Sequence, residues 1–247
     1  MKLFNVSSKF FTITHPYSAL LFGMGNKQRL HKDIIQKSAS FLFNEKINPA
    51  EWRNALTEIQ TNLLIPMNQI QGNSIVGNNL NTTLGKWMYC LVRVLKPETI
   101  VETGVSHGLS SWIILNALHK NNTGKLYSID FPNHDTNEDY NLVKTNFKTG
   151  WAVPEILKSK WELILGKSED VLPHLLPRLN KIDLFFHDSE HTYKNMKWEF
   201  TTVLPYLKKD GIIVSDDVQK NYAFRDFVTE YNLKALQFNK GGCAIYQ

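Results

Sequence analysis

Acidic residues recur where the predicted strands of this chain end, and acids at such positions can bind cations or sugar hydroxyls. They are Glu102, Asp130, Glu169 (beside Ser168), Asp188 with Glu190, and Asp216 with Asp217. A single acid at a strand end commonly caps the helix that follows, and this explanation is open for each of them taken alone. It is a weak explanation for the whole set. Because ligands bind at the carboxyl ends of strands in open α/β sheets, we expect a site there.

The segment Thr99–Ser111 is the clearest ligand-binding signal. An apolar pair leads into Glu102, two glycines follow at Gly104 and Gly108, and a helical pattern begins near Ser111. This order predicts a strand, a tight turn and the start of a helix. Glycine allows positive φ and close approach of a ligand, and a helix N-terminus offers free N–H groups. The turn is therefore typical of a site for a nucleotide-like ligand.

The glycine spacing narrows the class of ligand. The pattern is G-x-x-x-G, and it lacks the G-x-G-x-x-G spacing that cradles a pyrophosphate. Carboxylates beside the turn would repel phosphates and attract a sulfonium and an α-ammonium. Asp130 lies 28 positions after Glu102, at the end of the next predicted strand, where an acid can hold both ribose hydroxyls. A nicotinamide-dependent oxidoreductase is an alternative, and the spacing argues against it.

Three aspartates form a second predicted cluster. Asp188 and Asp216 end two strands that are candidates for neighbours, and Asp217 follows directly. Three converging carboxylates repel one another unless a cation lies between them. Oxygen ligands favour Mg²⁺, Mn²⁺ or Ca²⁺, and such an ion lowers the pKa of a bound hydroxyl. The sequence thus predicts a divalent metal site, with helix capping by the same residues as the alternative.

His191 and Glu190 are the candidate general bases, because they directly follow Asp188. A histidine that titrates near neutral pH suits proton removal from a substrate hydroxyl. A purely structural role for His191 at a helix start is equally open. Strand alternation points His187 to the opposite face of the sheet. His107 lies in the glycine turn and is interpreted as a loop residue near the ligand.

Strands and helices alternate after Pro97. This alternation predicts a parallel sheet with helices on both faces. The last two strands, joined by a Lys240-Gly241-Gly242 hairpin signal, put an antiparallel strand at one edge. The predicted strands are 99–102, 125–129, 161–165, 182–186, 211–215, 233–238 and 243–246; the predicted helices are 110–119, 154–160, 168–179, 192–207 and 221–231.

Residues 1–96 carry no nucleotide signal and are expected to form a mainly helical cap or extension; residues 97–247 form the ligand-binding domain. Asn48 and Pro49 predict a helix start, and Pro97 ends the last helix of this region. The other expectations are a short strand or arm at 10–13, a helix at 30–43, a loop at 69–81, a helix from 82 or 83, and a long loop at 131–151.

Composition is that of an ordinary globular protein. The 247 residues are 43% hydrophobic and 21% charged, with a net charge of +5. Scattered lysines, without a block of like charges, argue against a nucleic-acid partner, and no apolar run is long enough for a membrane span. The cysteines, Cys90 and Cys243, have no metal-type spacing, so we expect reduced thiols and a cytoplasmic location. The expected partner is a small molecule, with a homo-oligomer left open.

These motifs resemble class I S-adenosylmethionine-dependent methyltransferases. The likeness covers about Pro97 to Gln247, through E-T-G-V-S-H-G-L-S-S and through I-D-L-F-F-H-D-S-E-H-T-Y followed by L-K-K-D-G-I-I-V-S-D-D-V. The later motifs resemble a branch that includes metal-dependent small-molecule and sugar O-methyltransferases. The chain departs from that branch at Ser189-Glu190, where related enzymes often show a smaller residue and an aspartate.

The resemblance implies a Rossmann-like seven-stranded sheet whose last strand is antiparallel. It also implies residue roles. Glu102, Gly104 and Gly108 would hold the methionine part, with Ser106, Ser110 and Asp188 beside it; Asp130 would hold the ribose, Ser168 or Glu169 the adenine, and Asp188, Asp216 and Asp217 a Mg²⁺ ion.

We expect a methyltransferase that moves a methyl group from S-adenosylmethionine to a small hydroxyl compound, with sugars among the candidates. His191 or Glu190 would be the base. A protein that binds the cofactor without catalysis is an alternative from another class.

Overall fold

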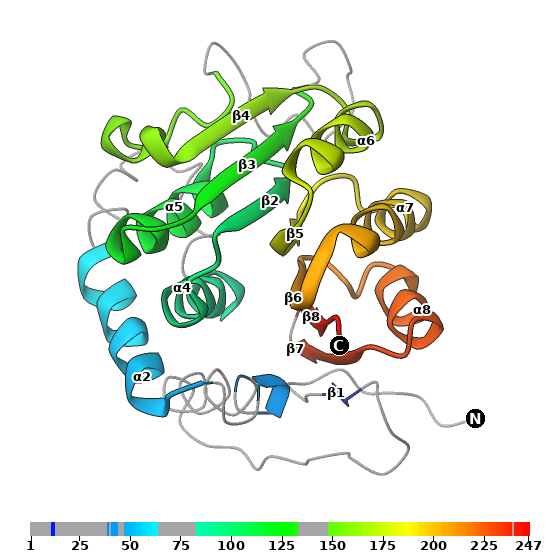
Figure 1. Ribbon diagram of the computed structural model, residues 1–247, viewed down its shortest axis with the longest axis horizontal. Coiled ribbons are helices and arrows are strands. Elements are labelled where there is room, and N and C mark those ends of the chain that lie inside the picture. Colours follow the sequence, from blue (N-terminus) through cyan, green and yellow to red (C-terminus); the bar gives the residue numbers. More distant parts are fainter. Residues whose placement is uncertain are drawn as a thin grey trace.

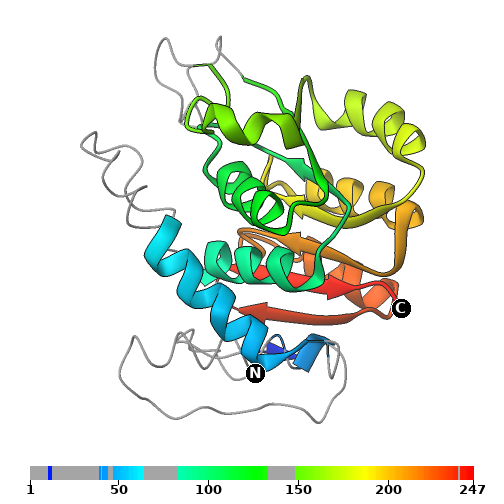
Figure 2. The same ribbon diagram turned by 60° about the vertical axis from the view of Figure 1, so that its left-hand side comes forward.

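The computed structural model describes residues 11–12, 39, 41–43, 47–63, 83–132, 148–238 and 240–247. These residues form a sheet with helices packed on both faces (Figures 1 and 2). The strands are β1 (Phe11–Thr12), β2 (Thr99–Thr103), β3 (Lys125–Asp130), β4 (Trp161–Leu165), β5 (Ile182–His187), β6 (Leu207–Ser215), β7 (Lys234–Phe238) and β8 (Gly241–Ile245).

The helices divide between the two faces of the sheet. They are α2 (Pro49–Glu58), α4 (Thr83–Leu95), α5 (Leu109–Asn121), α6 (Ser168–Leu179), α7 (Tyr193–Val203) and α8 (Ala223–Glu230), with short helical turns η2 (Ile59–Leu63), η3 (Glu155–Lys160) and η4 (Leu204–Tyr206). The predicted alternation of strands and helices after Pro97 is confirmed, with boundaries that shift by a few residues.

The strand order is β1-β7-β8-β6-β5-β2-β3-β4. Strands β2 to β6 are parallel to one another, and β8 is antiparallel to both β6 and β7. The seven predicted strands are present, and β1 adds a two-residue edge by pairing antiparallel with β7. β2 lies between β3 and β5, so the chain changes direction across the sheet at β2, which is where open α/β sheets bind ligands.

The predicted C-terminal antiparallel hairpin is confirmed, but its antiparallel strand does not lie at the edge of the sheet. The antiparallel strand β8 lies inside the sheet, between β6 and β7. All five of its residues, Gly-Gly-Cys-Ala-Ile, are buried. Small side chains allow this strand to fit between two helical layers. A Cβ at Gly242 would lie 2.7 Å from a ring carbon of Phe224 on α8.

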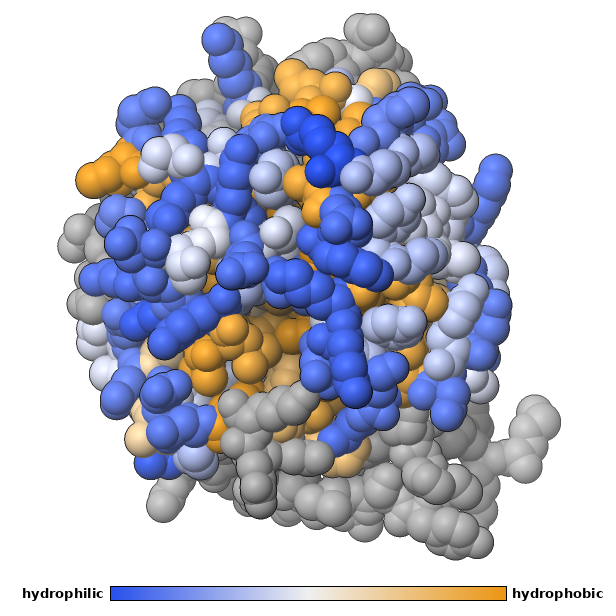
Figure 3. Space-filling model, in the orientation of Figure 1, coloured by the Kyte–Doolittle hydropathy of each residue, from blue (hydrophilic) through white to orange (hydrophobic). Residues whose placement is uncertain are grey.

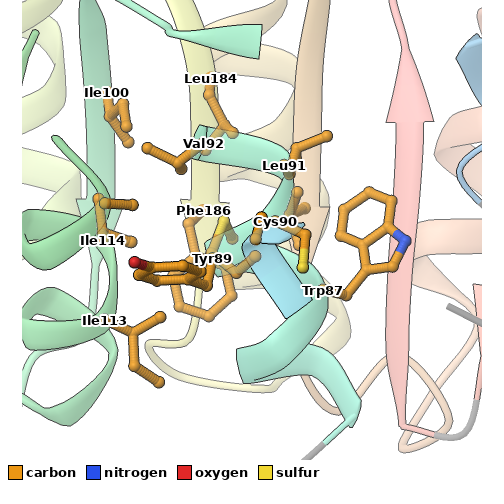
Figure 4. Close-up of a cluster of buried hydrophobic side chains, with 14 of the residues drawn as sticks. Trp87, Tyr89, Cys90, Leu91, Val92, Ile100, Ile113, Ile114, Leu184 and Phe186 are labelled. Carbon is orange, nitrogen blue, oxygen red and sulfur yellow. The ribbon is translucent and has the colours of Figure 1, made fainter. Parts of the chain in front are cut away.

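Helices α4 and α5 cover one face of the sheet and share a hydrophobic core with it. Figure 4 shows Leu91 and Val92 of α4 in one buried cluster with Ile100 of β2 and Ile114 of α5. Every residue from Trp87 to Val92 is buried. Helix α4 therefore packs between α2 and α5 as part of this layer, and the domain boundary at residue 96 stays a prediction.

The opposite face is covered by α6, α7 and α8. Their apolar side chains pack with alternate residues of the strands, such as Val101 and Phe185. Neighbouring strand residues Ile100 and Phe186 belong to the first face. This alternation confirms helices on both sides, and it aims His187 at α7, as strand periodicity predicts.

Local signals at helix starts are partly confirmed. Asn48 caps α2, because its side chain accepts a hydrogen bond from the N–H of Ala50 at 2.8 Å. Helix α6 begins at Ser168. Lys167 occupies its N-cap position, and no side-chain hydrogen bond caps this helix. The expected loop at 69–81 and most of the expected helix at 30–43 and of the loop at 131–151 lie outside the described residues.

A cavity of about 370 Å³ lies at the amino ends of the parallel strands, among them the start of β5 at Asp183 and the start of β6 near Lys208. Figure 3 shows a hydrophobic patch over the region of α4, bordered above and at its sides by hydrophilic side chains. This cavity is at the opposite edge from the acids that end the strands. In the ranges described, no helix has the length and apolarity needed to cross a bilayer.

Candidate functional site

The tips of β2, β3 and β5 meet at one edge of the sheet and bring most predicted site residues together. Register pairs Glu102 with Ser128 on β3 and with Phe186 on β5. The residues just beyond these strands, Gly104 and Asp188, are therefore neighbours in space although they are far apart in sequence.

Glu102 is completely buried and holds this edge together. One carboxylate oxygen accepts a hydrogen bond from Ser110 Oγ at 2.6 Å; the other accepts from Ser111 Oγ at 2.5 Å and from Ser128 Oγ at 2.6 Å. Burial raises the pKa of Glu102, although these three hydroxyls oppose the shift. Since Glu102 has no exposed surface, its carboxylate anchors the turn instead of lining an open site.

Gly104 lies where two loops touch. Its φ is +86°, and an added Cβ would be 2.0 Å from the backbone oxygen of Asp188. The N–H of Asp188 donates to Thr103 O at 2.8 Å. Only glycine meets both conditions, so in this structure the close approach that the sequence predicted is made by the chain itself. Gly104 thereby fixes the position of the Asp188 backbone.

Gly108 has the same property on the other side of the turn. It precedes α5 with φ +90°, and its added Cβ would be 2.8 Å from Cα of Gly150. The N–H of Gly150 donates to Ser106 O at 2.8 Å, and that of Ala152 donates to His107 O at 3.0 Å. Segment 148–153 is therefore fastened over the glycine turn. His107 is a loop residue, as interpreted, with its ring edge toward Trp151.

Asp130 is partly exposed beside the same turn. One oxygen accepts from the N–H of Val105 at 2.9 Å, and the other from Thr149 Oγ1 at 3.0 Å. The carboxylate keeps lone pairs for further donors. Phe131 follows with 54% of its surface exposed, and Lys167 lies 5.7 Å from its ring centre. Ser168 and the exposed Glu169 come directly after Lys167, at the start of α6.

Asp188 and His191 adjoin at the tip of β5. The distance from His191 Nε2 to Asp188 Oδ1 is 3.6 Å, and 14% of the histidine side chain is exposed. Within the described part of the chain, His191 Nε2 is buried and has no hydrogen-bond partner. Burial, with neighbouring His187 and Lys220, lowers the pKa of His191 to about 4. The imidazole is therefore neutral at pH 7 and able to accept a proton. Glu190 is exposed to solvent instead.

A buried hydrogen-bond network lies directly behind His191. His187 Nδ1 is 2.7 Å from Glu199 Oε2 of α7, and both residues are completely buried. Thr103 Oγ1 donates to the same carboxylate at 2.6 Å and Ser189 Oγ at 2.8 Å. The rings of His187 and His191 are 5.2 Å apart, edge to face. The network therefore ties β2, β5, α7 and the loop that carries His191 into one unit.

Asp216 and Asp217 follow β6, beside Asp188. Burial and the Asp216 carboxylate raise the pKa of Asp188 well above its ordinary value. Burial also raises that of Asp216. Asp217 behaves differently: burial opposes its ionisation, but Lys220 and Gln219 bring its pKa below the ordinary value. Lys220 Nζ lies 2.6 Å from Asp217 Oδ2, and Gln219 Nε2 lies 2.9 Å from Oδ1.

The predicted three-aspartate metal site does not fit this arrangement. Both carboxylate oxygens of Asp217 already accept hydrogen bonds, one of them from an ammonium. Across the ranges that the structure describes, no group of three or more histidine, cysteine, aspartate or glutamate side chains is arranged to hold a metal ion. No step of the chemistry below passes through a metal.

Sequence reasoning overlooked three residues here. Glu199 lies mid-helix in W-E-F, where only its complete burial marks it as special. Phe131 is the first residue of the predicted loop 131–151, and its exposed ring offers a surface on which a planar group can stack. Lys220 lies three positions after Asp217, the spacing of one turn, and this spacing is the signal for their ion pair.

Replacing Gly104 by alanine should destabilise the fold by about 2 kcal/mol or more, because positive φ and a backbone clash both oppose a Cβ. Urea unfolding measures this loss. Gly124→Ala is the matched control, since its φ is +79° and its Cβ would lie 2.3 Å from Pro97 O at the opposite edge. Both variants should lose stability, and only Gly104→Ala should also lose affinity for S-adenosylhomocysteine. Equal affinity in the two would contradict the placement of the site.

Replacing Glu199 by glutamine should cost about 2 kcal/mol or more, because hydrogen bonds to a buried charge are lost. The folded pKa of Glu199 is lowered. Its stabilising effect is therefore complete above the unfolded value of 4.5 and disappears as pH falls through the folded pKa. Urea unfolding from neutral to acid pH measures both effects. The exposed Glu190→Gln should change stability by less than about 0.5 kcal/mol; a similar loss in both variants would refute the role of the network.

The comparisons with known proteins agree with this geometry. Residues 101–218 match a family model described as a methyltransferase domain. No curated protein matches the chain in sequence. Among solved structures, the O-methyltransferase from Bacillus cereus, in complex with S-adenosylhomocysteine, is similar at 15% identity and a TM-score of 0.56, over 79% of this chain and 97% of that one.

Two further structures show the same likeness. CalS11, a TDP-rhamnose 3′-O-methyltransferase of calicheamicin biosynthesis, shares 18% identity at a TM-score of 0.52, over 80% of this chain and 94% of that one. The O-methyltransferase TomG from Streptomyces achromogenes, in complex with S-adenosylmethionine, shares 16% identity at a TM-score of 0.50, over 91% and 100%. Residues 101–218 therefore match a methyltransferase domain, and the chain has the Rossmann-like fold of class I S-adenosylmethionine-dependent methyltransferases.

Proposed function

We propose that the protein transfers a methyl group from S-adenosylmethionine to a hydroxyl group of a small molecule. The observation that carries this proposal is the neutral ring of His191, which lies beside Asp188. The Nε2 atom of this ring is buried and has no hydrogen-bond partner among the described residues. A buried nitrogen without a hydrogen-bond partner destabilises the fold unless a ligand forms a hydrogen bond with it. It lies at the edge of the sheet where the glycine turn would hold the cofactor.

The chain's own groups fit such a cofactor. Asp130 would accept hydrogen bonds from the ribose hydroxyls, Phe131 would stack on the adenine, and Ser168 or Glu169 would contact the adenine edge. The turn at Ser106 and Ser110 and the carboxylate of Asp188 would face the methionine part, whose ammonium an acid favours. Glu102, Gly104 and Gly108 would support this surface from behind, because they pack against the chain itself.

The reaction needs little from the protein besides alignment and removal of a proton. S-adenosylmethionine would supply a methyl group on a positively charged sulfur. His191 would take the proton of the acceptor hydroxyl as the new carbon–oxygen bond forms and the carbon–sulfur bond breaks, which leaves S-adenosylhomocysteine, the methyl ether and a protonated His191. Glu199 and His187 would hold His191 in line.

The proposed acceptor is a class of compounds, small molecules with a hydroxyl group. Sugars and phenols are the first compounds to test, because one similar structure is of a sugar O-methyltransferase. The buried cysteines Cys90 and Cys243 are both free thiols, which supports a reducing, cytoplasmic setting.

Asp130→Asn should weaken S-adenosylhomocysteine binding about tenfold, because one charged acceptor for the ribose hydroxyls is lost. Isothermal titration calorimetry measures the change. Asp183→Asn is the control, since Asp183 pairs with Lys208 at the opposite edge of the sheet. Absence of binding to the wild-type protein, or tighter binding of NAD, would refute the proposed function.

The pH dependence of methyl transfer provides a test of His191. Because its pKa is about 4, the ring is in its basic form throughout neutral pH. Turnover that depends on it should be flat from about pH 6 to 8 and fall as acid protonates the ring. His191→Asn should lower turnover about a hundredfold or more and leave S-adenosylhomocysteine affinity intact. The assay is release of S-adenosylhomocysteine with a panel of phenols and nucleotide sugars. Full activity of this variant would exclude His191 as the base.

A further inference from the structure

Two lysines lie in the acid cluster beside His191. Lys220 Nζ is 2.6 Å from Asp217 Oδ2, and Lys240 Nζ is 3.8 Å from Asp217 Oδ1. Lys220 is the more enclosed of the two, with 43% of its side chain exposed against 65% for Lys240. They reach the cluster from different parts of the chain, the loop before α8 and the β7–β8 hairpin.

Backbone contacts fix Lys220 near the reacting groups. Its N–H donates to Asp217 O at 3.0 Å and closes a tight turn. The next residue, Asn221, donates its side-chain amide to His191 O at 2.9 Å. Asp216 is bound to the end of β5 through His187 O at 3.0 Å. The turn that carries Lys220 is therefore attached directly to the loop that carries His191.

The two lysines carry the same charge as a divalent cation. Three carboxylates converge here, and a divalent cation would bring two positive charges to them. Lys220 and Lys240 together bring the same two charges. A metal that bound Asp217 would compete there with a charge-assisted hydrogen bond of the strong kind.

We propose that Lys220, assisted by Lys240, is the cation of this active site in place of a divalent metal, and that methyl transfer here does not need one. The proposal rests on the proposed function. The Lys220 ammonium stabilises the acceptor oxygen as His191 removes its proton, by donating a hydrogen bond to the negative charge that develops. Asp217 holds the lysine in position for this task.

Binding of Mn²⁺ tests the proposal without an acceptor. Mn²⁺ takes the oxygen ligands that Mg²⁺ takes, and electron paramagnetic resonance measures its free concentration. The wild-type protein, saturated with S-adenosylhomocysteine, should leave Mn²⁺ free at millimolar concentration. The double variant Lys220→Met with Lys240→Met should bind one Mn²⁺ per chain at least about tenfold more tightly, because two positive charges close to the carboxylates are removed.

Matched variants separate charge from folding. Lys220→Arg keeps the charge and should bind no Mn²⁺. Lys120→Met removes an exposed lysine at the end of α5, at the other edge of the sheet, and should behave as wild type. In the double variant, Asp216→Asn should abolish the acquired Mn²⁺ binding.

Tight binding of one Mn²⁺ to the wild-type protein, lost in Asp188→Asn, would overturn the proposal; this measurement needs no lysine variant to fold. So would a folded double variant that gains no affinity for Mn²⁺. Calorimetry with S-adenosylhomocysteine reports separately on the proposed function. Failure to bind it refutes that function, whereas normal binding together with a tight Mn²⁺ site refutes only the role of Lys220.

Discussion

The buried carboxylate of Glu102 is the interaction on which the site depends. A carboxylate without solvent is unstable unless hydrogen-bond donors surround it, and three serine hydroxyls from α5 and β3 meet this need. Because these serines must reach Glu102, the start of α5 and the tip of β3 are held against the tip of β2. The position of the glycine turn follows from this requirement.

Gly104 links the position of the glycine turn to that of Asp188 and His191. Its lack of a side chain lets the backbone of Asp188 lie against the turn, so the proposed cofactor surface and the proposed base are built on the same contact. The Glu199–His187 pair then fixes the following loop from behind. A rigid support of this kind is what a reaction limited by alignment requires.

Burial has one effect on the charges of Asp188 and His191 and another on the charge of Asp217. Burial lowers the pKa of His191 and raises that of Asp188, so it opposes the charged form of each. Asp217 stays ionised because Lys220 compensates it. An acid cluster is therefore ambiguous by composition: the same carboxylates serve a metal or a lysine, and nearby side chains decide between them.

The sequence by itself determined the order of elements and the kind of ligand turn. Alternation of apolar residues and glycine spacing are local properties, and the strands from Thr99 to Phe238 follow from them with small shifts of boundary. The tertiary structure alone decided that Glu102 and Gly104 contact other segments of the protein. It also decided that β8 lies between β6 and β7 and that Asp217 is paired with Lys220. Each of these depends on atoms brought together from distant segments, and no local pattern records which partner a buried charge or a missing side chain will meet.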